Sequence, residues 1–315
     1  MTDIYPPGTI FITGSTGYVG SRLLASLSLR GRRVISVGRS SSCDLTFNQF
    51  VTLKGLADPI LIHLAGIAHD LAGAKNLDEY YAVNVELTQT LLEAFVRQEG
   101  GKFVFISTIK AAEFDDRSPA NPTVYAQTKY EAELRVRAAL LGDVSRDYFI
   151  LRPCLILGDH PKGNLRLLGS LAARGVPYPL GAYSNRKSLL SLDNFTFLIE
   201  KIVESSLAPG TYALSDPEPL AATELFSQIS LALGRKPRIW SVPKIIVRGW
   251  ARMGDHLPMG LNSERLSKLT LDDTCDSTAL VSALGGEVLP RSTSEMITSA
   301  FGSEARSPMD LSGGR

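Results

Sequence analysis

Two side chains that can exchange a proton stand four residues apart near the middle of the chain. Tyr125 and Lys129 enclose the segment YAQTK, and residues four apart lie on one face of a helix. An unperturbed tyrosine titrates near ~10, and a neighbouring ammonium group lowers that pKa towards the working range of a general acid. We predict that Tyr125 is the proton donor and that Lys129 lowers its pKa. The alternative is an exposed aromatic residue beside a solvated lysine.

A pair of hydroxyl groups precedes this helix. Ser107 and Thr108 end the apolar run KFVFIST, and Thr108 lies 17 residues before Tyr125. Ligands of α/β sheets bind at the carboxyl ends of strands, so a hydroxyl at this edge can hydrogen-bond the oxygen that Tyr125 protonates. Thr108 and Ser107 are both candidates for this third catalytic residue.

A glycine-rich turn follows the first apolar run. GTIFIT continues into GSTGYVG, in which Gly14, Gly17 and Gly20 stand three apart. The first glycine permits a tight turn, the second lets backbone amides approach a pyrophosphate, and the third lets a helix pack closely on the strand. A tight turn without a ligand is the alternative to a dinucleotide-phosphate loop. The residues predicted to contact the dinucleotide here are Gly14, Thr16, Gly17, Tyr18 and Val19.

The next apolar run, RRVISVG, ends without the acidic residue that binds the ribose of NAD. Arg39 and Ser40 follow it instead, and both can bind a 2′-phosphate. We therefore favour NADP(H) as the cofactor and keep NAD(H) as the alternative, in which Arg39 is a solvated loop residue.

Short apolar runs alternate with helical periodicity around these groups. Continuously apolar strands separated by helices indicate right-handed βαβ units and a parallel sheet covered on both faces. The fold class expected is α/β: a Rossmann-type doubly wound parallel sheet with a smaller C-terminal α/β substrate lobe. Strands are predicted over 8–13, 32–38, 59–66, 102–108 and 147–153, helices over 18–29, 77–98 and 124–141, and further short elements over 194–206, 210–215, 222–233 and 243–254.

The chain becomes rich in glycine and proline after Pro153. We predict an NAD(P)-binding Rossmann domain over 1–155 and a substrate-binding lobe over 156–301, interleaved with the last strands of the sheet. The polar segment 302–315 is expected to be disordered.

Five segments together resemble a known family: TGSTGYVG, IHLAG, NVELTQTLLEA, FVFIST and YAQTK. They occur in the order seen in extended short-chain dehydrogenases/reductases of the NAD-dependent epimerase/dehydratase family. Later segments, such as KGNLRLL and NRKSLLSLDN, resemble its bacterial nucleotide-sugar 4-reductases and UDP-glucose 4-epimerase-like 4-epimerases. The resemblance implies catalysis by Thr108, Tyr125 and Lys129. It implies further cofactor contacts from Asp44, Leu45, Leu64, Ala65, Gly66, Asn84 and Ser107, besides Tyr125 and Lys129 themselves.

The resemblance also implies a substrate site for a nucleotide-diphosphate sugar. Arg186, seven residues before Asp193, matches the arginine that reaches the diphosphate, and Asn164 matches a position near the diphosphate or the uridine. Arg265 is a weaker candidate, as is Arg166. For each of them the alternative is a solvated polar side chain.

Two features bear on the reaction. Thr108 is followed by Ile109 and Lys110, where family dehydratases carry an acidic pair, so dehydration is not expected. Arg39 fits NADPH and favours reduction of a 4-keto nucleotide sugar, of the UDP-4-keto-6-deoxy-N-acetylhexosamine type, in bacterial surface polysaccharide synthesis. The alternatives are a 4-epimerase with retained NAD and a non-catalytic NADP-binding protein, although sensor-type relatives usually lose the tyrosine–lysine pair.

Composition excludes several other classes. The net charge is +1, which gives no field for nucleic acid, and the histidines and cysteines show no metal-ligand spacing. The chain lacks a signal peptide and a membrane-spanning apolar run, so a cytoplasmic location is expected. Its oligomeric state stays open, with a homodimer among the alternatives.

The segment 243–254 pairs basic with bulky apolar residues, as membrane-surface helices do, but we favour a lid that packs on the substrate lobe.

Overall fold

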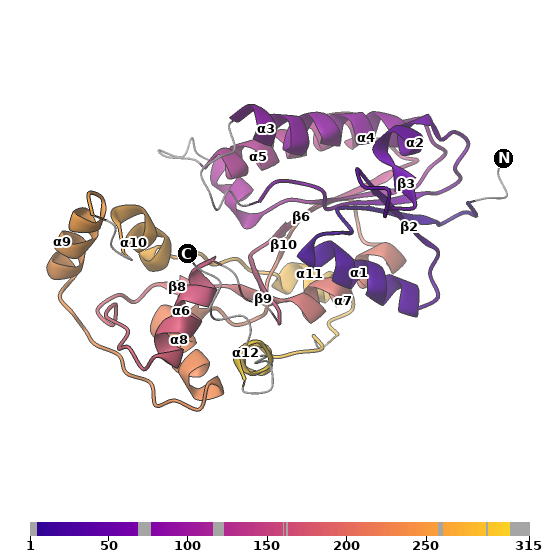
Figure 1. Cartoon of the computed structure of the whole chain (residues 1–315). Coiled ribbons are helices and arrows are strands. Elements are labelled where there is room, and N and C mark those ends of the chain that lie inside the picture. Colours follow the sequence, from indigo (N-terminus) through magenta and orange to yellow (C-terminus); the bar gives the residue numbers. More distant parts are fainter. Residues whose placement is uncertain are drawn as a thin grey trace. The chain divides into compact units, whose positions relative to one another are not determined.

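The computed structural model describes residues 5–68, 77–115, 123–159, 161, 163–257, 261–287 and 289–302. The segment predicted to be disordered therefore lies, from residue 303 on, outside the described residues. The chain divides into two compact units (Figure 1). The first comprises Met1–Pro153, Phe195–Leu214 and Ser277–Glu287, and the second comprises Cys154–Asn194, Ser215–Asp276 and Val288–Arg315.

A seven-stranded sheet forms the centre of the first unit. Its order is β10-β6-β5-β4-β1-β2-β3, and every neighbouring pair is parallel. The order changes direction at β1, which lies between β2 and β4, and ligands of doubly wound sheets bind at such a switch point. The strands are β1 (Ile10–Thr13), β2 (Val34–Gly38), β3 (Leu45–Thr46), β4 (Ile60–His63), β5 (Lys102–Ile106), β6 (Asp147–Pro153) and β10 (Gly210–Leu214).

Helices cover both faces of this sheet. Figure 1 shows α3, α4 and α5 on one face and α1, α7 and α11 on the other. The side chains of Phe11, Phe103 and Ile150 have no exposed surface, as expected for parallel strands buried on both faces. The predicted fold class is thereby confirmed. The helices are α1 (Tyr18–Leu29), α2 (Phe47–Thr52), α3 (Leu77–Tyr81), η1 (Ala82–Glu86), α4 (Leu87–Val96), η2 (Ile109–Phe114), α5 (Val124–Leu140), α7 (Leu192–Glu204) and α11 (Thr278–Ala283).

The second unit has its own core and only short strands. β7 (Leu155–Leu157) pairs parallel with β9 (Leu189–Ser191), and β8 (Arg186–Lys187) pairs antiparallel with β11 (Leu220–Ala221). Helices supply most of the core, in which the rings of Tyr178 and Phe226 stack at a centroid distance of 5.0 Å. They are α6 (Gly163–Ala173), α8 (Ala222–Ala232), α9 (Lys244–Gly254), α10 (Ser263–Thr270) and α12 (Thr293–Phe301).

Candidate functional site

The glycine turn after β1 is built for close backbone approach. Gly14 has a φ of 73°, and a Cβ there would lie 2.7 Å from the backbone nitrogen of Ala65. A Cβ on Gly20 would lie 2.2 Å from the carbonyl oxygen of Gly14, so only glycine lets α1 start directly above the strand end. Gly17 is the N-cap of α1, and no side chain caps its N-terminal amides. Binding of a phosphate at this helix N-terminus stays a prediction.

The other predicted loop residues surround this turn. Thr16 is exposed, and Tyr18 and Val19 are half-buried at the start of α1. After β4, Leu64 and Ala65 are half-buried and Gly66 is exposed.

A buried histidine ties the two loops together, and sequence reasoning missed it. His63, at the end of β4, lies 2.7 Å from the Thr13 hydroxyl through Nδ1 and 2.9 Å from the Thr88 hydroxyl through Nε2. Burial, with the charge of Lys129 as a smaller cause, lowers the pKa of His63 to about 3. The imidazole is therefore neutral at physiological pH. Its only signal in the sequence is a polar residue that ends an apolar strand.

The hydrogen bonds around His63 also fix its tautomer. The Thr88 hydroxyl donates to the carbonyl of Asn84 at 2.7 Å, so it can only accept from the imidazole. Nε2 therefore carries the proton and Nδ1 accepts from Thr13, whose oxygen in turn accepts from the backbone N–H of Ala65 at 3.1 Å. The chain of hydrogen bonds holds the Gly14 turn against the loop that follows β4.

Asn84 anchors the same loop from a π-helical turn. Its side chain accepts from the Ile67 N–H at 2.8 Å and donates to the Ile67 carbonyl at 3.2 Å and to the Thr128 hydroxyl at 3.0 Å. Asn84 is fully buried, and both amide hydrogens are used within the protein. π-Helical turns occur often at functional sites, and here the turn positions an amide that joins the loop to α5.

Thr108 and Tyr125 meet at the carboxyl edge of β5. Thr123 caps α5 by accepting from the Ala126 N–H at 3.2 Å, so Tyr125 lies in the first turn of the helix. The Thr108 hydroxyl hydrogen-bonds the Tyr125 phenol and lowers its pKa, but burial dominates and raises that pKa to about 12. The sequence predicts that Lys129 lowers this pKa, and this effect is not found. Burial raises the pKa of Tyr125, and Lys129 does not contribute to the shift.

Lys129 is directed at the end of β5. Its ammonium donates to the carbonyl of Ile106 at 2.7 Å and lies 4.5 Å from the centroid of the Phe105 ring. Burial lowers the pKa of Lys129 to about 8, against the opposing effect of Glu133. A Cβ on Gly66 would lie 3.2 Å from this ammonium, so the lysine also borders the loop after β4.

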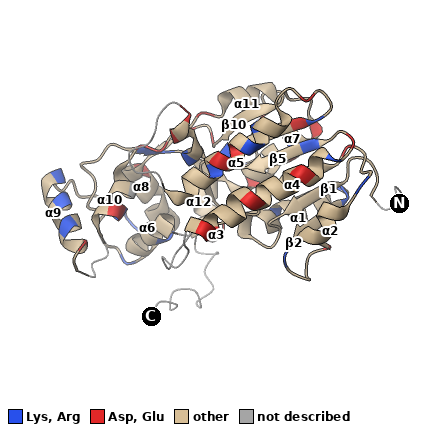
Figure 2. Cartoon of the chain, turned by 90° about the horizontal axis from the view of Figure 1, so that it is seen from above, with Lys and Arg blue, Asp and Glu red and all other residues tan. Residues whose placement is uncertain are grey.

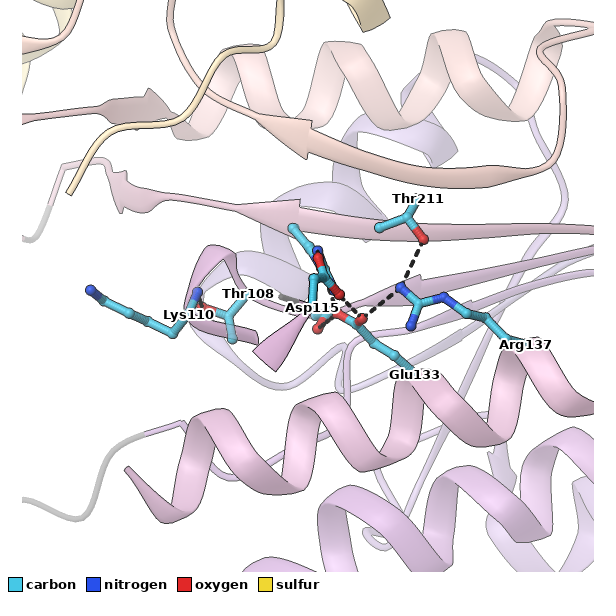
Figure 3. Close-up of polar contacts among 8 residues, drawn as sticks. Thr108, Lys110, Asp115, Glu133, Arg137 and Thr211 are labelled. Atoms are coloured by element: carbon cyan, nitrogen blue, oxygen red, sulfur yellow. Dashed lines mark hydrogen bonds and ion pairs between the residues drawn. The ribbon is translucent and has the colours of Figure 1, made fainter. Parts of the chain in front are cut away.

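A cluster of buried ion pairs lies next to the carboxyl edge of β5 (Figure 3). Arg152 on β6 donates to both carboxylate oxygens of Glu133, at 2.9 and 2.6 Å, and also pairs with Asp115. Ser107 donates to Glu133 at 2.5 Å. Since the Ser107 proton is already engaged, Thr108 is the better placed of the two hydroxyls to face a substrate oxygen. Sequence reasoning missed the cluster, although Glu133 lies four residues after Lys129 on α5.

The cluster extends to the edge strand. Arg137 donates to Glu133 at 3.0 Å and to the Thr211 hydroxyl on β10 at 3.1 Å, and Figure 3 shows both contacts. Lys110 points away from these groups in the same view, and it pairs with Glu113 at 3.4 Å. Removing one partner of a buried ion pair typically costs about 3–5 kcal/mol, so these charges hold β6, β10 and α5 in register.

The residues after β2 leave an exposed arginine at the strand end. Arg39 is exposed, and Ser40 accepts from the Ser42 N–H at 3.1 Å within a tight turn. Asp44 accepts from the Ser36 N–H and hydroxyl at 2.8 and 2.6 Å, which lowers its pKa. Leu45, beside it on β3, is half-buried.

The predicted substrate residues all belong to the second unit. Asn164 is half-buried on α6, Arg265 is exposed on α10, and Arg186 is exposed on β8. The guanidinium of Arg186 donates to the carbonyl of Pro219 at 2.5 Å, and its backbone N–H donates to Asp272 at 2.7 Å. Their predicted contacts with a diphosphate remain predictions. Among the described helices, none combines the length and apolar content that a membrane span needs.

The chain matches a known family of enzymes. Residues 10–176, just over half of the chain, match the model of the NAD dependent epimerase/dehydratase family. The chain is 28% identical over 263 residues to a UDP-glucose 4-epimerase of Vibrio cholerae, covering 75% of this chain and 79% of that one. It is 31% identical over 257 residues to a 2-alkyl-3-oxoalkanoate reductase of Stenotrophomonas maltophilia (strain K279a), covering 73% and 77%.

A solved structure shares the fold. MoeE5 in complex with UDP-glucose and NAD superposes with a TM-score of 0.69 at 20% identity, covering 93% of this chain and 97% of that one. The family match spans the glycine turn, Thr108, Tyr125 and Lys129. The chain therefore belongs to the NAD-dependent epimerase/dehydratase family and is an NAD(P)-dependent enzyme of the extended short-chain dehydrogenase/reductase type.

Proposed function

We propose that the enzyme reduces a 4-keto nucleotide sugar, of the UDP-4-keto-6-deoxy-N-acetylhexosamine type, with NADPH. The observation that carries this proposal is the exposed Arg39 at the end of β2, which fits the 2′-phosphate of NADPH, and Tyr125 beside Thr108 supplies the proton. A tyrosine whose pKa is about 12 keeps its proton at neutral pH, and reduction of a carbonyl needs a proton donor.

The cofactor fits the residues of the first unit. The turn at Gly14 and Gly20 admits no Cβ, and the first amides of α1 carry no side-chain cap. Arg39 at the end of β2 favours a 2′-phosphate over a bare ribose hydroxyl. When bound, the cofactor supplies the hydride.

Each catalytic side chain then has a separate task. Tyr125 gives its proton to the carbonyl oxygen, and Thr108 donates a second hydrogen bond to the negative charge that develops there. Lys129, held at the Ile106 carbonyl, keeps a positive charge at the strand edge. The Glu133 and Arg152 pair holds Ser107 and α5 in place behind them.

The substrate assignment draws on the second unit and on the relatives. We propose that Arg186 binds the diphosphate, with help from Arg265 and Asn164. A UDP-sugar is the substrate named for the Vibrio relative, and the Stenotrophomonas relative is a reductase by name, so enzymes at this distance perform net reduction. Surface polysaccharide synthesis in bacteria consumes such sugars, and we place the reaction in the cytoplasm.

The second candidate is a 4-epimerase with retained NAD, which the Vibrio relative favours. One assay separates the two. The purified protein is incubated with NADPH and UDP-4-keto-6-deoxy-N-acetylglucosamine, and separately with UDP-N-acetylglucosamine without added cofactor. We expect NADPH consumption matched by a 4-hydroxy product in the first reaction only. Conversion of UDP-N-acetylglucosamine to its 4-epimer would establish the second candidate, and no turnover of either would refute both.

A further inference from the structure

The stretch between Glu224 and Asp255 contains no acidic residue. It contains six basic ones, in a chain whose net charge is only +1, and both tryptophans of the chain, Trp240 and Trp250. Positive charge and tryptophan are thus concentrated in one tenth of the sequence. The basic residues are Arg235, Lys236, Arg238, Lys244, Arg248 and Arg252.

Helix α9 sorts part of this stretch into three faces. Only Val247 and Ala251 are buried, and they hold the helix on the second unit. Lys244, Arg248 and Arg252 are four residues apart and form a basic stripe. Figure 2 shows basic residues along α9. Lys244 also lies 5.1 Å from the centroid of the Tyr183 ring.

The third face of α9 is apolar and exposed. Ile245 is 80% exposed and Trp250 is 44% exposed, and Ile246 and Met253 are exposed beside them. Trp240, shortly before the helix, is 61% exposed. We call Trp240 and the four apolar side chains on α9 the apolar stripe. Val247 and Ala251 pack α9 on the second unit, as the lid interpretation expects, but the apolar stripe itself stays exposed.

The combination fits a helix that lies on a lipid surface. A helix with a basic face and a tryptophan-containing apolar face binds with its apolar side among the acyl chains and its cations at anionic headgroups. The 11 residues of α9 span about 16 Å, too short to cross a bilayer core of about 30 Å. The helix can therefore lie on a membrane but cannot cross it.

We propose that α9 and Trp240 dock the enzyme onto an anionic phospholipid bilayer. Charge complementarity selects this occupant over a second copy of the chain. A symmetric dimer built on α9 would bring together two helices that carry three basic residues and no acidic residue each, and like charges would repel. An anionic bilayer neutralises the same stripe while it covers the apolar one. The proposal does not depend on which sugar or ketone the active site reduces.

Both tryptophans lie in the stripe, so the fluorescence of the full-length protein reports on it directly. The protein is mixed with vesicles of phosphatidylcholine containing phosphatidylglycerol, and with vesicles of phosphatidylcholine alone. Binding is measured by co-sedimentation and by the tryptophan emission. We expect binding and a blue shift with the anionic vesicles only, both weakened by added salt.

Two paired variants test the two stripes. Arg248→Gln with Arg252→Gln removes charge, and Ile245→Asn with Met253→Asn removes apolar contact, while both tryptophans stay. Each pair should weaken binding at least 10-fold, at unchanged circular dichroism and thermal midpoint. The matched controls are Leu29→Asn on α1, where the leucine is 88% exposed, and Arg33→Gln, also at an exposed position. Neither should change binding.

Three outcomes overturn the proposal. The first is no binding to anionic vesicles. The second is equal binding by the wild type and both stripe variants. The third is a doubled mass in light scattering without lipid that Ile245→Asn with Met253→Asn abolishes, which would assign the stripe to a second copy instead.

Discussion

At the residue scale, burial and hydrogen bonding act in opposite directions on the pKa of Tyr125. Tyr125 sits on α5 with its pKa raised to about 12, and Thr108 opposes that shift without reversing it. The ammonium of Lys129, the residue expected to lower this pKa, instead donates a hydrogen bond to the Ile106 carbonyl and lies over the Phe105 ring. The spacing of a tyrosine and a lysine in a sequence specifies a shared helix face, but not where the ammonium points.

Tyr125→Phe removes the proton donor and keeps the ring. General acid catalysis contributes roughly 10²–10⁴-fold, so kcat should fall by at least that range while the cofactor still binds. Tyr130→Phe is the matched control, because Tyr130 lies on the same helix and stacks on Phe114 at a centroid distance of 5.1 Å. Steady-state kinetics and cofactor titration check both variants. Full activity in Tyr125→Phe would refute the assigned role.

Arg39→Asp should exchange the cofactor preference. A charge-assisted contact contributes roughly 1.5–3 kcal/mol, so the wild type should bind NADPH at least ~10-fold more tightly than NADH, and the variant should reverse this. Arg33→Asp is the control, since Arg33 is exposed at the opposite end of β2. Fluorescence titration with both cofactors measures the ratio. Equal wild-type affinities would remove Arg39 from the site.

The pH profile of reduction should report Lys129. The pKa of Lys129 is about 8, which is lower than the pKa of about 12 for Tyr125. As pH rises through 8, Lys129 loses its charge first, so kcat/KM for reduction should decline there, because this ratio reports groups of the free enzyme. The decline should be absent from the residual activity of Lys129→Met. A wild-type profile that stays level from pH 7 to 10 contradicts this assignment.

At the element scale, the first helix depends on one glycine. The carbonyl of Gly14 occupies the space that a Cβ on Gly20 would need, so Gly20→Ala must push α1 away from β1. We expect both lower stability and weaker cofactor binding from this change. Gly249→Ala is the control, because a Cβ on that helical glycine meets nothing within 4 Å. It should raise the free energy of unfolding by up to about 1 kcal/mol. Denaturant unfolding and cofactor titration distinguish the two, and unchanged affinity in Gly20→Ala would contradict the packing argument.

Hydrophobic periodicity predicted the larger elements well. The predicted bounds of α1 and β6 agree with the structure, and α5 ends one residue earlier than predicted. The long helix predicted over 77–98 contains a π-helical turn at Ala82–Glu86, which a period of 3.6 residues cannot reveal. The two-residue β3 and the helices α10–α12 were not predicted, because elements this short or this polar depend on tertiary packing. Helix α6 was also not predicted, although it is as long as α8 and α9.

Site residues were predictable where backbone geometry restricts the residue type. Gly14 and Gly20 must be glycine for steric reasons, so the spacing of these glycines can be recognised in the sequence. His63, Glu133 and Arg152 act through partners on other strands and helices, up to 50 residues away for the His63–Thr13 contact. No local pattern marks such long-range contacts, so the sequence could not reveal them.

At the scale of the whole molecule, buried ionisable groups divide into two kinds. Glu133 and Arg152 are buried as a hydrogen-bonded ion pair. His63 is buried in its neutral form, and its two ring nitrogens are hydrogen-bonded to the Thr13 and Thr88 hydroxyls. His63 therefore links the stability of the protein to pH below 6.5.

The last prediction follows from the sign of that linkage. His63 has a pKa of about 3 in the folded protein, against 6.5 for a histidine in the unfolded chain. Below pH 6.5 the unfolded chain therefore binds a proton that the folded protein does not bind. The free energy of unfolding should therefore fall as pH decreases from 6.5 towards 3, by about 1.4 kcal/mol per pH unit. Between pH 6 and 4.5 this fall precedes the protonation of Asp115, whose pKa lies below 3.8.

Denaturant unfolding at closely spaced pH values measures the slope. His63→Gln can still accept and donate a hydrogen bond but does not titrate, so its slope should be flatter by that amount. His256→Gln, at an exposed histidine, is the control and should keep the wild-type slope. The Cε1 proton resonance of His63 gives a second measurement that needs no variant, because it should not titrate above pH 4 in the folded protein. An ordinary titration near pH 6.5 would show that His63 is charged in the folded state, and the hydrogen-bonded tautomer assigned to it would then be wrong.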